Sequence, residues 1–112
     1  MSCKSKGINF ERTVKQYLKK QGCLVVRQAA SLFPDIVAIT PTNTEVVIGN
    51  TTFHGTFILI VECKASKGKL SSTEQTAMLG LAKKYHATAL YAMRGRTLKD
   101  IVWERIVSTQ QI

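Results

Sequence analysis

Several acidic residues of this sequence stand where an isolated charge would be costly to bury. Glu62 and Lys64 continue the alternate positions of an apolar run that includes Ile60. If this run is a strand, the three side chains share one face, and a carboxylate and an ammonium extend a hydrophobic surface. Asp35 opens a second apolar run. Two carboxylates at the ends of neighbouring strands would suit Mg²⁺, which binds few carboxylates together with waters and phosphate oxygens.

A lysine beside such a pair can stabilise charge on a phosphate or orient an attacking water. Each residue also has a simpler explanation. Asp35 could begin a turn, and Glu62 and Lys64 could form a structural ion pair at a strand end. Glu11, at the edge of an apolar helix stripe, could be an ordinary solvated carboxylate. Taken together, however, the acidic residues and the lysine favour metal-dependent hydrolysis of a phosphodiester.

The net charge indicates the class of partner. Sixteen Lys and Arg stand against seven Asp and Glu, which gives a formal charge of +9. Such a field attracts polyanions and makes their binding depend on salt. The sequence contains no strongly basic amphipathic helix and no Arg-rich tail, so nucleic acid is favoured over a membrane surface.

Other classes of protein are disfavoured by the composition. Cys3, Cys23 and Cys63 are odd in number and form no close pair, which argues against a disulfide framework and against a zinc site. No apolar run is long enough to cross a bilayer, and the basic N-terminus lacks the apolar segment of a signal peptide. We therefore expect a cytoplasmic protein, in the host cytoplasm if it is viral.

Apolar periodicity predicts the elements that must position these residues. Phe10, Val14 and Leu18 repeat along one face of an amphipathic helix over 9–20, and Gly22 suits its end. Short apolar runs predict the strands, which cover 24–27, 35–39, 57–65, 87–93 and, more weakly, 101–107, with a small hairpin at 46–50 inside the polar segment 40–55.

A second helix is predicted from a capping box, Ser71 with Glu74, and runs to Tyr85. Gln75 lies on its inward face, either as a capping residue or as a polar contact that reaches the site. The apolar residues expected to face inward are Met78, Leu79, Ala82 and Tyr85. The order of elements predicts one α/β domain over 1–112, with a mixed central sheet flanked by helices and a flexible basic segment at 1–6.

Pro34-Asp35 followed by Glu62-Cys63-Lys64 resembles the PD-(D/E)XK nuclease signature. The surrounding sequence is similar, in order and spacing, to the archaeal-type Holliday junction resolvases, often called Hjc. This resemblance covers about Lys6 to Arg94, with an extension through Trp103. The matching positions are Lys6-Gly7, Phe10-Glu11-Arg12, Gly22, Val25-Val26-Arg27, Ala29, Ser31, Asp35, Val37-Ala38, Ile60 to Lys64, Ala82 to Tyr85 and Ala89 to Ala92.

The resemblance implies a restriction-endonuclease-like core and a homodimer that cuts opposing strands of a four-way DNA junction. Glu11, Asp35 and Glu62 would hold Mg²⁺, for which Mn²⁺ can substitute, and Lys64 would be the catalytic lysine. The catalytic set would also include Arg27, the family's functional arginine, and Ser31, in the loop before the aspartate. Basic residues expected to contact DNA are Lys4, Lys6, Arg12, Arg27, Lys67 and Lys69. Without the resemblance, Arg27 could be a solvated side chain and Ser31 a loop residue that binds backbone groups.

Two departures leave other functions open. The segment 40–55 is longer than the family's usual turn between the motif strands, and the chain ends early. Gly68-Lys69-Leu70-Ser71 with Gln75 also resembles the compact phage-type repair nucleases that share this core and act on other DNA structures. A non-catalytic DNA-binding module is a further alternative, although such a module gains nothing from carboxylates that face phosphate.

Overall fold

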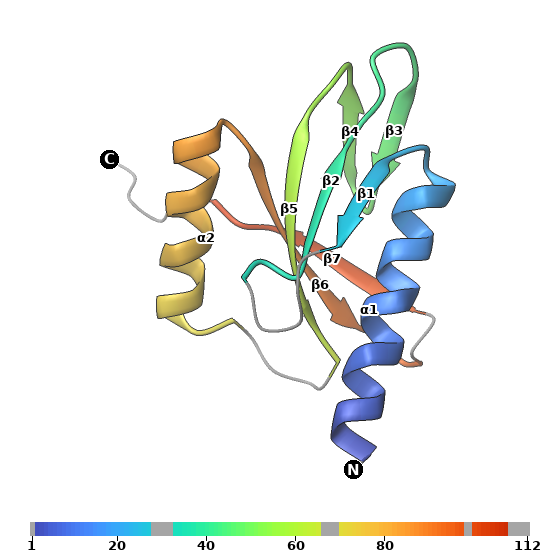
Figure 1. Ribbon diagram of the computed structural model, residues 1–112, viewed down its shortest axis with the longest axis vertical. Helices are drawn as coiled ribbons and strands as arrows, with labels where there is room; N and C mark the ends of the chain where they lie inside the picture. Colours follow the sequence, from blue (N-terminus) through green and yellow to red (C-terminus); the bar gives the residue numbers. More distant parts are fainter. Residues whose placement is uncertain (1, 28–32, 66–69, 98–99, 108–112) are drawn as a thin grey trace.

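The computed structural model describes residues 2–27, 33–65, 70–97 and 100–107, with the side chains of residues 2–8 and of Arg27 left outside the description. A five-stranded mixed sheet in the order β1-β2-β5-β6-β7 lies between two helices (Figure 1). The elements are α1 (Ser2–Lys20), β1 (Leu24–Arg27), β2 (Ile36–Ile39), β3 (Glu45–Ile48), β4 (Thr51–His54), β5 (Ile58–Lys64), α2 (Ser72–Tyr85), β6 (Thr88–Arg94) and β7 (Ile101–Arg105). The predicted α/β class and mixed sheet are confirmed.

Helix α1 buries the predicted apolar stripe. Phe10, Val14 and Leu18 are fully buried, and the chain leaves the helix through Gly22, whose φ is +102°. The helix begins at Ser2 rather than at residue 9. The sequence did not indicate this start because no apolar repeat precedes Phe10 and the first turn contains no acidic residue.

Three antiparallel pairings and one parallel pairing build the sheet. Strand β2 pairs antiparallel with both β1 and β5, and β6 pairs antiparallel with β7. Strands β5 and β6 are parallel, and α2 lies between them in the sequence, as a parallel pair requires a crossover connection. The catalytic candidates Glu62 and Lys64 are therefore at the carboxyl end of the central strand.

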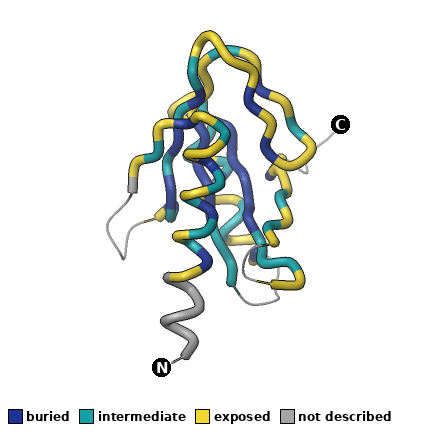
Figure 2. The backbone as a smooth tube through the Cα atoms, turned by 90° about the vertical axis from the view of Figure 1, so that its right-hand side faces the viewer, coloured by how far each residue is buried: buried dark blue, intermediate teal, exposed yellow. Residues whose placement is uncertain are grey.

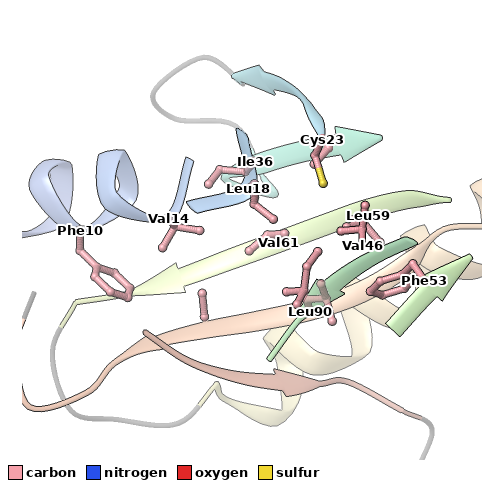
Figure 3. Packing of buried hydrophobic residues seen from close by; sticks show 13 residues of the cluster. Phe10, Val14, Leu18, Cys23, Ile36, Val46, Phe53, Leu59, Val61 and Leu90 are labelled. Carbon is pink, nitrogen blue, oxygen red and sulfur yellow. The ribbon is translucent and has the colours of Figure 1, made fainter. Parts of the chain in front are cut away.

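The two faces of the sheet have separate hydrophobic cores. Leu59 and Val61 of β5 point into a core that includes α1, whereas Ile60 points into a second core that includes Met78 of α2. Figure 3 shows the first of these cores, and Figure 2 shows buried residues concentrated along the strands. This alternation places Glu62, two residues after Ile60, on the face that α2 covers.

The predicted hairpin at 46–50 is confirmed as β3 and β4, which pair with each other. Val46 and Phe53 are buried in the same core as α1. Gly49 forms part of the turn at φ +61°, and a Cβ at this position would lie 2.7 Å from Cβ of Trp103. The long segment between the motif strands therefore forms a second layer beside α1 and extends the core.

One side-chain prediction and one strand end were wrong. Tyr85 was expected to face inward but is 55% exposed, while Met78 is fully buried. The strand predicted over 101–107 ends at Arg105, and the N–H of the buried Ile106 donates to the Ala89 carbonyl at 3.0 Å. Neither described helix is long and apolar enough to cross a membrane.

Candidate active site

Antiparallel pairing of β2 and β5 brings Asp35 and Glu62 together. Ile36 is the register partner of Val61, so Asp35, which precedes Ile36, lies beside Glu62, which follows Val61. The backbone N–H of Asp35 donates to Oε1 of Glu62 at 3.3 Å. The backbone N–H of Cys63 donates to Oδ2 of Asp35 at 2.9 Å. Each carboxylate is thus held by a backbone donor of the other strand.

The environment of these carboxylates disfavours their negative charges. Glu62 is 8% exposed, and burial together with the nearby Asp35 raises the pKa of Glu62 to about 7. Burial also raises the pKa of Asp35, against the opposing effect of the Cys63 backbone donor. A divalent cation would compensate both charges, and carboxylate oxygens are the hard ligands that Mg²⁺ and Mn²⁺ bind. The pair therefore fits a divalent metal.

Lys64 lies on the same face but has a different partner. Its Nζ is 2.9 Å from Oε2 of Glu74 in α2, and this hydrogen bond raises the pKa of Lys64. Within the described part of the chain, Lys64 forms no ion pair with Asp35 or Glu62. The ion pair that the sequence left open between Glu62 and Lys64 is replaced by one with Glu74, a residue that sequence reasoning assigned only to the helix cap.

Glu11 lies on the other side of the sheet, on α1. Its charge helps to raise the pKa of the Cys63 thiol, after burial and Asp35, so it is near the carboxyl end of β5. In the described residues, however, no group of three His, Cys, Asp or Glu side chains could hold a metal ion. The structure therefore brings together Asp35, Glu62 and Lys64, and the role of Glu11 as a third ligand stays a prediction.

A buried tyrosine lies next to Glu62 in the sheet. Tyr91 is the register partner of both Glu62 and Glu104, and burial raises the pKa of its phenol. Tyr91 and Gln75 line a cavity of about 310 Å³ on the face of α2. Gln75 was expected either to cap α2 or to reach the site. Its Nε2 donates to the Leu70 carbonyl at 3.3 Å, just before the start of α2, so its hydrogen bond is to the backbone near the cap.

The predicted DNA contacts are largely outside the described residues. Arg12 is an exposed residue of α1. Ser31, Lys67 and Lys69 lie outside the described residues, and for Arg27 only the backbone in β1 is described. The side chains of Lys4 and Lys6 are not described either. These residues remain predictions from the sequence.

Comparisons with known proteins identify the family of this chain. The family described as archaeal Holliday junction resolvase (hjc) matches residues 2–108. The chain belongs to the Hjc family. It is similar to the solved structure of Archaeoglobus fulgidus Hjc, a Holliday junction resolvase from an archaeal hyperthermophile, with 28% identity and a TM-score of 0.61. The match covers 90% of this chain and 71% of that chain. None of the curated proteins matches the chain.

As an Hjc member, the protein is a Holliday junction resolvase, an endonuclease of DNA recombination and repair that uses a divalent metal. The restriction-endonuclease-like fold expected from the motif is confirmed by the structural match. The resemblance inferred from Pro34-Asp35 and Glu62-Cys63-Lys64 is confirmed over nearly the whole chain. The alternatives of a phage-type repair nuclease and of a non-catalytic binding module are therefore set aside in favour of the resolvase.

Proposed function

We propose that the protein resolves four-way DNA junctions by paired hydrolysis of phosphodiester bonds, with Mg²⁺ held by Asp35 and Glu62. The observation that carries this role is the pair of carboxylates, Glu62 buried and Asp35 partly buried, each fixed by a backbone N–H from the opposite side of the pair. When bound, the metal supplies a water of lowered pKa and neutralises charge on the leaving oxygen. Mn²⁺ would bind the same oxygens.

The protein side chains prepare this site in two ways. Backbone hydrogen bonds to Oδ2 of Asp35 and to Oε1 of Glu62 fix the orientation of each carboxylate. The direction of the second oxygen of each group is thereby fixed as well. Lys64, with an ammonium favoured by Glu74, stabilises negative charge on the scissile phosphate. We propose Glu11 as a further metal ligand on the strength of the family motif alone. Arg27 and Ser31 would act beside this centre.

Junction DNA would be bound mainly through its backbone. The charge of +9 and the exposed Arg12 support phosphate contacts, which track shape rather than base sequence. The further DNA contacts that we propose are Lys4, Lys6, Arg27, Lys67 and Lys69. Recognition would then depend on the geometry of the four-way junction.

Paired cutting requires two active centres, and we propose that a homodimer supplies them. An apolar groove of about 450 Å³ lies between β2, β5 and α2. Tyr85 is 55% exposed there, and Phe33 and Ile58 are each 37% exposed. A gathering of large exposed apolar side chains is typical of a protein–protein interface. This groove is the surface of the described residues that best suits a second copy of the chain.

Cleavage of labelled junctions tests the proposed function. Asp35→Asn keeps the size of the side chain but removes the charge that binds metal, and should lower cleavage by at least about 100-fold while junction binding persists. End-labelled four-way junction, flap, linear duplex and single strand would be incubated with Mg²⁺, with Mn²⁺ and with EDTA. Paired nicks confined to the junction, dependent on metal and on Asp35, are expected.

Other products of that assay would contradict the proposed function. Equal cutting of flaps and duplex would leave a nuclease without the junction preference. Binding of the junction without cutting in either metal would exclude hydrolysis as the activity of this chain. Undiminished cutting by Asp35→Asn would remove Asp35 from the metal site.

A further inference from the structure

Glu74 contacts the catalytic lysine although it belongs to neither motif strand. Its Oε2 accepts a hydrogen bond from Lys64 Nζ at 2.9 Å. Both side chains are about one-third exposed, at 31% for Glu74 and 32% for Lys64. The charge of Glu74 also acts on Asp35 and on Glu62. The Glu74 carboxylate of α2 therefore contacts Lys64 and acts electrostatically on Asp35 and Glu62.

The capping box makes Glu74 a rigid partner. Oε1 of Glu74 accepts from the backbone N–H of Ser71 at 3.0 Å, and Oγ of Ser71 accepts from the backbone N–H of Glu74 at 3.1 Å. The two oxygens of Glu74 thus have different partners, one at the start of α2 and one on Lys64. A side chain held at both ends loses little further conformational freedom when it pairs with the lysine.

Lys64 has an alternative set of anions close by. It shares a face with Glu62, and its positive charge acts on both Glu62 and Asp35. Glu62 is more deeply buried than Glu74, so an ammonium placed beside Glu62 would be less screened. Such an ammonium would compensate the charges that otherwise attract a metal. Within the described residues, Lys64 is instead paired with Glu74.

We propose that Glu74 is a positioning residue that holds the Lys64 ammonium off the Asp35–Glu62 pair, so that the carboxylates stay open to a divalent metal and the ammonium stays available to the phosphate. This role rests on the proposed function, because it assumes that Asp35 and Glu62 bind the metal. It assigns a function to a residue outside the nuclease motif. It also connects the start of α2 to the catalytic centre.

A double-mutant cycle with Mn²⁺ as the probe tests this role. Glu74→Gln retains the capping box, because glutamine also accepts from the Ser71 N–H, but it removes the charge that holds Lys64. Mn²⁺ affinity, measured by electron paramagnetic resonance without DNA, should fall about tenfold in Glu74→Gln. In a Lys64→Met background the same substitution should leave the Mn²⁺ affinity unchanged, since no ammonium is left to move.

The cycle distinguishes two ways in which Glu74 could act. An equal loss of Mn²⁺ affinity in both backgrounds would mean that Glu74 attracts the metal by its own charge, and would overturn the positioning role. No loss in either background would overturn it as well. Ser71→Ala is the matched control, because it breaks the cap and lowers Tm without touching the contact with Lys64. Its Mn²⁺ affinity should equal that of the wild type.

A metal-free measurement separates this role from the proposed function. The ¹⁵N signal of the Lys64 ammonium should shift less on Asp35→Asn in the wild-type background than in the Glu74→Gln background, because Glu74 holds the ammonium away from Asp35. An equal shift on Asp35→Asn in both backgrounds would contradict the positioning role. If the wild type binds Mn²⁺ no better than Asp35→Asn does, the metal site of the proposed function fails, and the ammonium signals still decide whether Glu74 restrains Lys64.

Discussion

At Glu62, the proposed binding of a metal opposes the stability of the folded protein. The side chain is 8% exposed and lies beside Asp35, so its ionised form is unfavourable in the folded protein. A residue selected only for stability at this position would be apolar, as Ile60 is on the same face. The backbone donor from Asp35 offsets part of this cost. The rest of the free-energy cost of ionising Glu62 would be offset by a bound cation.

This conflict predicts a pH-dependent gain in stability for Glu62→Gln. The folded pKa of about 7 exceeds the ordinary value of 4.5. A raised carboxyl pKa stabilises the fold at low pH, and that contribution is lost as the pH rises from about 4.5 through about 7. In EDTA, Glu62→Gln should therefore be more stable than the wild type at pH 8, by on the order of 1–3 kcal/mol, and about equal to it at pH 4.

Urea unfolding at the two pH values measures this difference. Glu45→Gln is a suitable control, because its exposed carboxylate should give a small change at either pH. A stability difference for Glu62→Gln that is the same at pH 4 and pH 8 would show that the folded protein does not disfavour the ionised carboxylate.

At the scale of elements, the β3–β4 hairpin and the start of α2 contact different parts of the molecule. The β3–β4 hairpin contributes buried residues to the core of α1 and contacts β7 through Gly49 and Trp103. The start of α2 contributes a cap whose glutamate also reaches Lys64. The hairpin therefore supports the fold on the side of the sheet opposite to α2, whereas α2 supports the catalytic face.

Alanine at Gly49 should be more destabilising than alanine at Gly55. Both glycines have positive φ, so each alanine costs about 1–2 kcal/mol in backbone strain. Only Gly49 would also place a Cβ against Trp103, whereas a Cβ at Gly55 has no atom within 4 Å. Overpacking should add about 1–3 kcal/mol at Gly49. Thermal unfolding of both variants measures this, and equal losses would mean that the hairpin can move away from β7.

At the scale of the whole molecule, a positive charge suited to DNA and an apolar groove suited to a second copy of the chain occur in one small domain. The chain has an overall charge of +9, and of the two carboxylates proposed to bind the metal, Glu62 is buried and Asp35 is partly buried. The apolar groove lined by Phe33, Ile58 and Tyr85 lies on the face of α2, as do Glu62 and Lys64. A partner bound in the groove would therefore place a second active centre on the same assembly.

Tyr85→Glu should dissociate the proposed dimer. A carboxylate in an apolar interface loses its hydration without gaining a partner, so the association constant should fall by at least about tenfold. Analytical ultracentrifugation at micromolar concentration measures the oligomeric state. Val47→Glu on the hairpin, where the side chain is also exposed, is the matched control and should stay dimeric. A wild type that is monomeric, or dissociation by both variants alike, would contradict this interface.

Much of the fold could be predicted because its signals are local. The stripe of Phe10, Val14 and Leu18 and the capping box of Ser71 with Glu74 each depend on spacing within one element, and both are confirmed. The errors arose where local patterns meet tertiary packing. Tyr85 continues the helical spacing, yet the sheet does not cover it.

Local patterns were enough to place Glu62 and Lys64 on one face of a strand, because side chains alternate along any strand, and to propose Asp35 as their companion at the start of a second apolar run. The neighbouring positions of β2 and β5, in the register that joins Asp35 to Glu62, became known from the folded structure alone. The tertiary structure also decided that Lys64 pairs with Glu74, because this contact depends on how α2 crosses the sheet. Such choices are made by packing between distant segments, which no periodicity along the chain records.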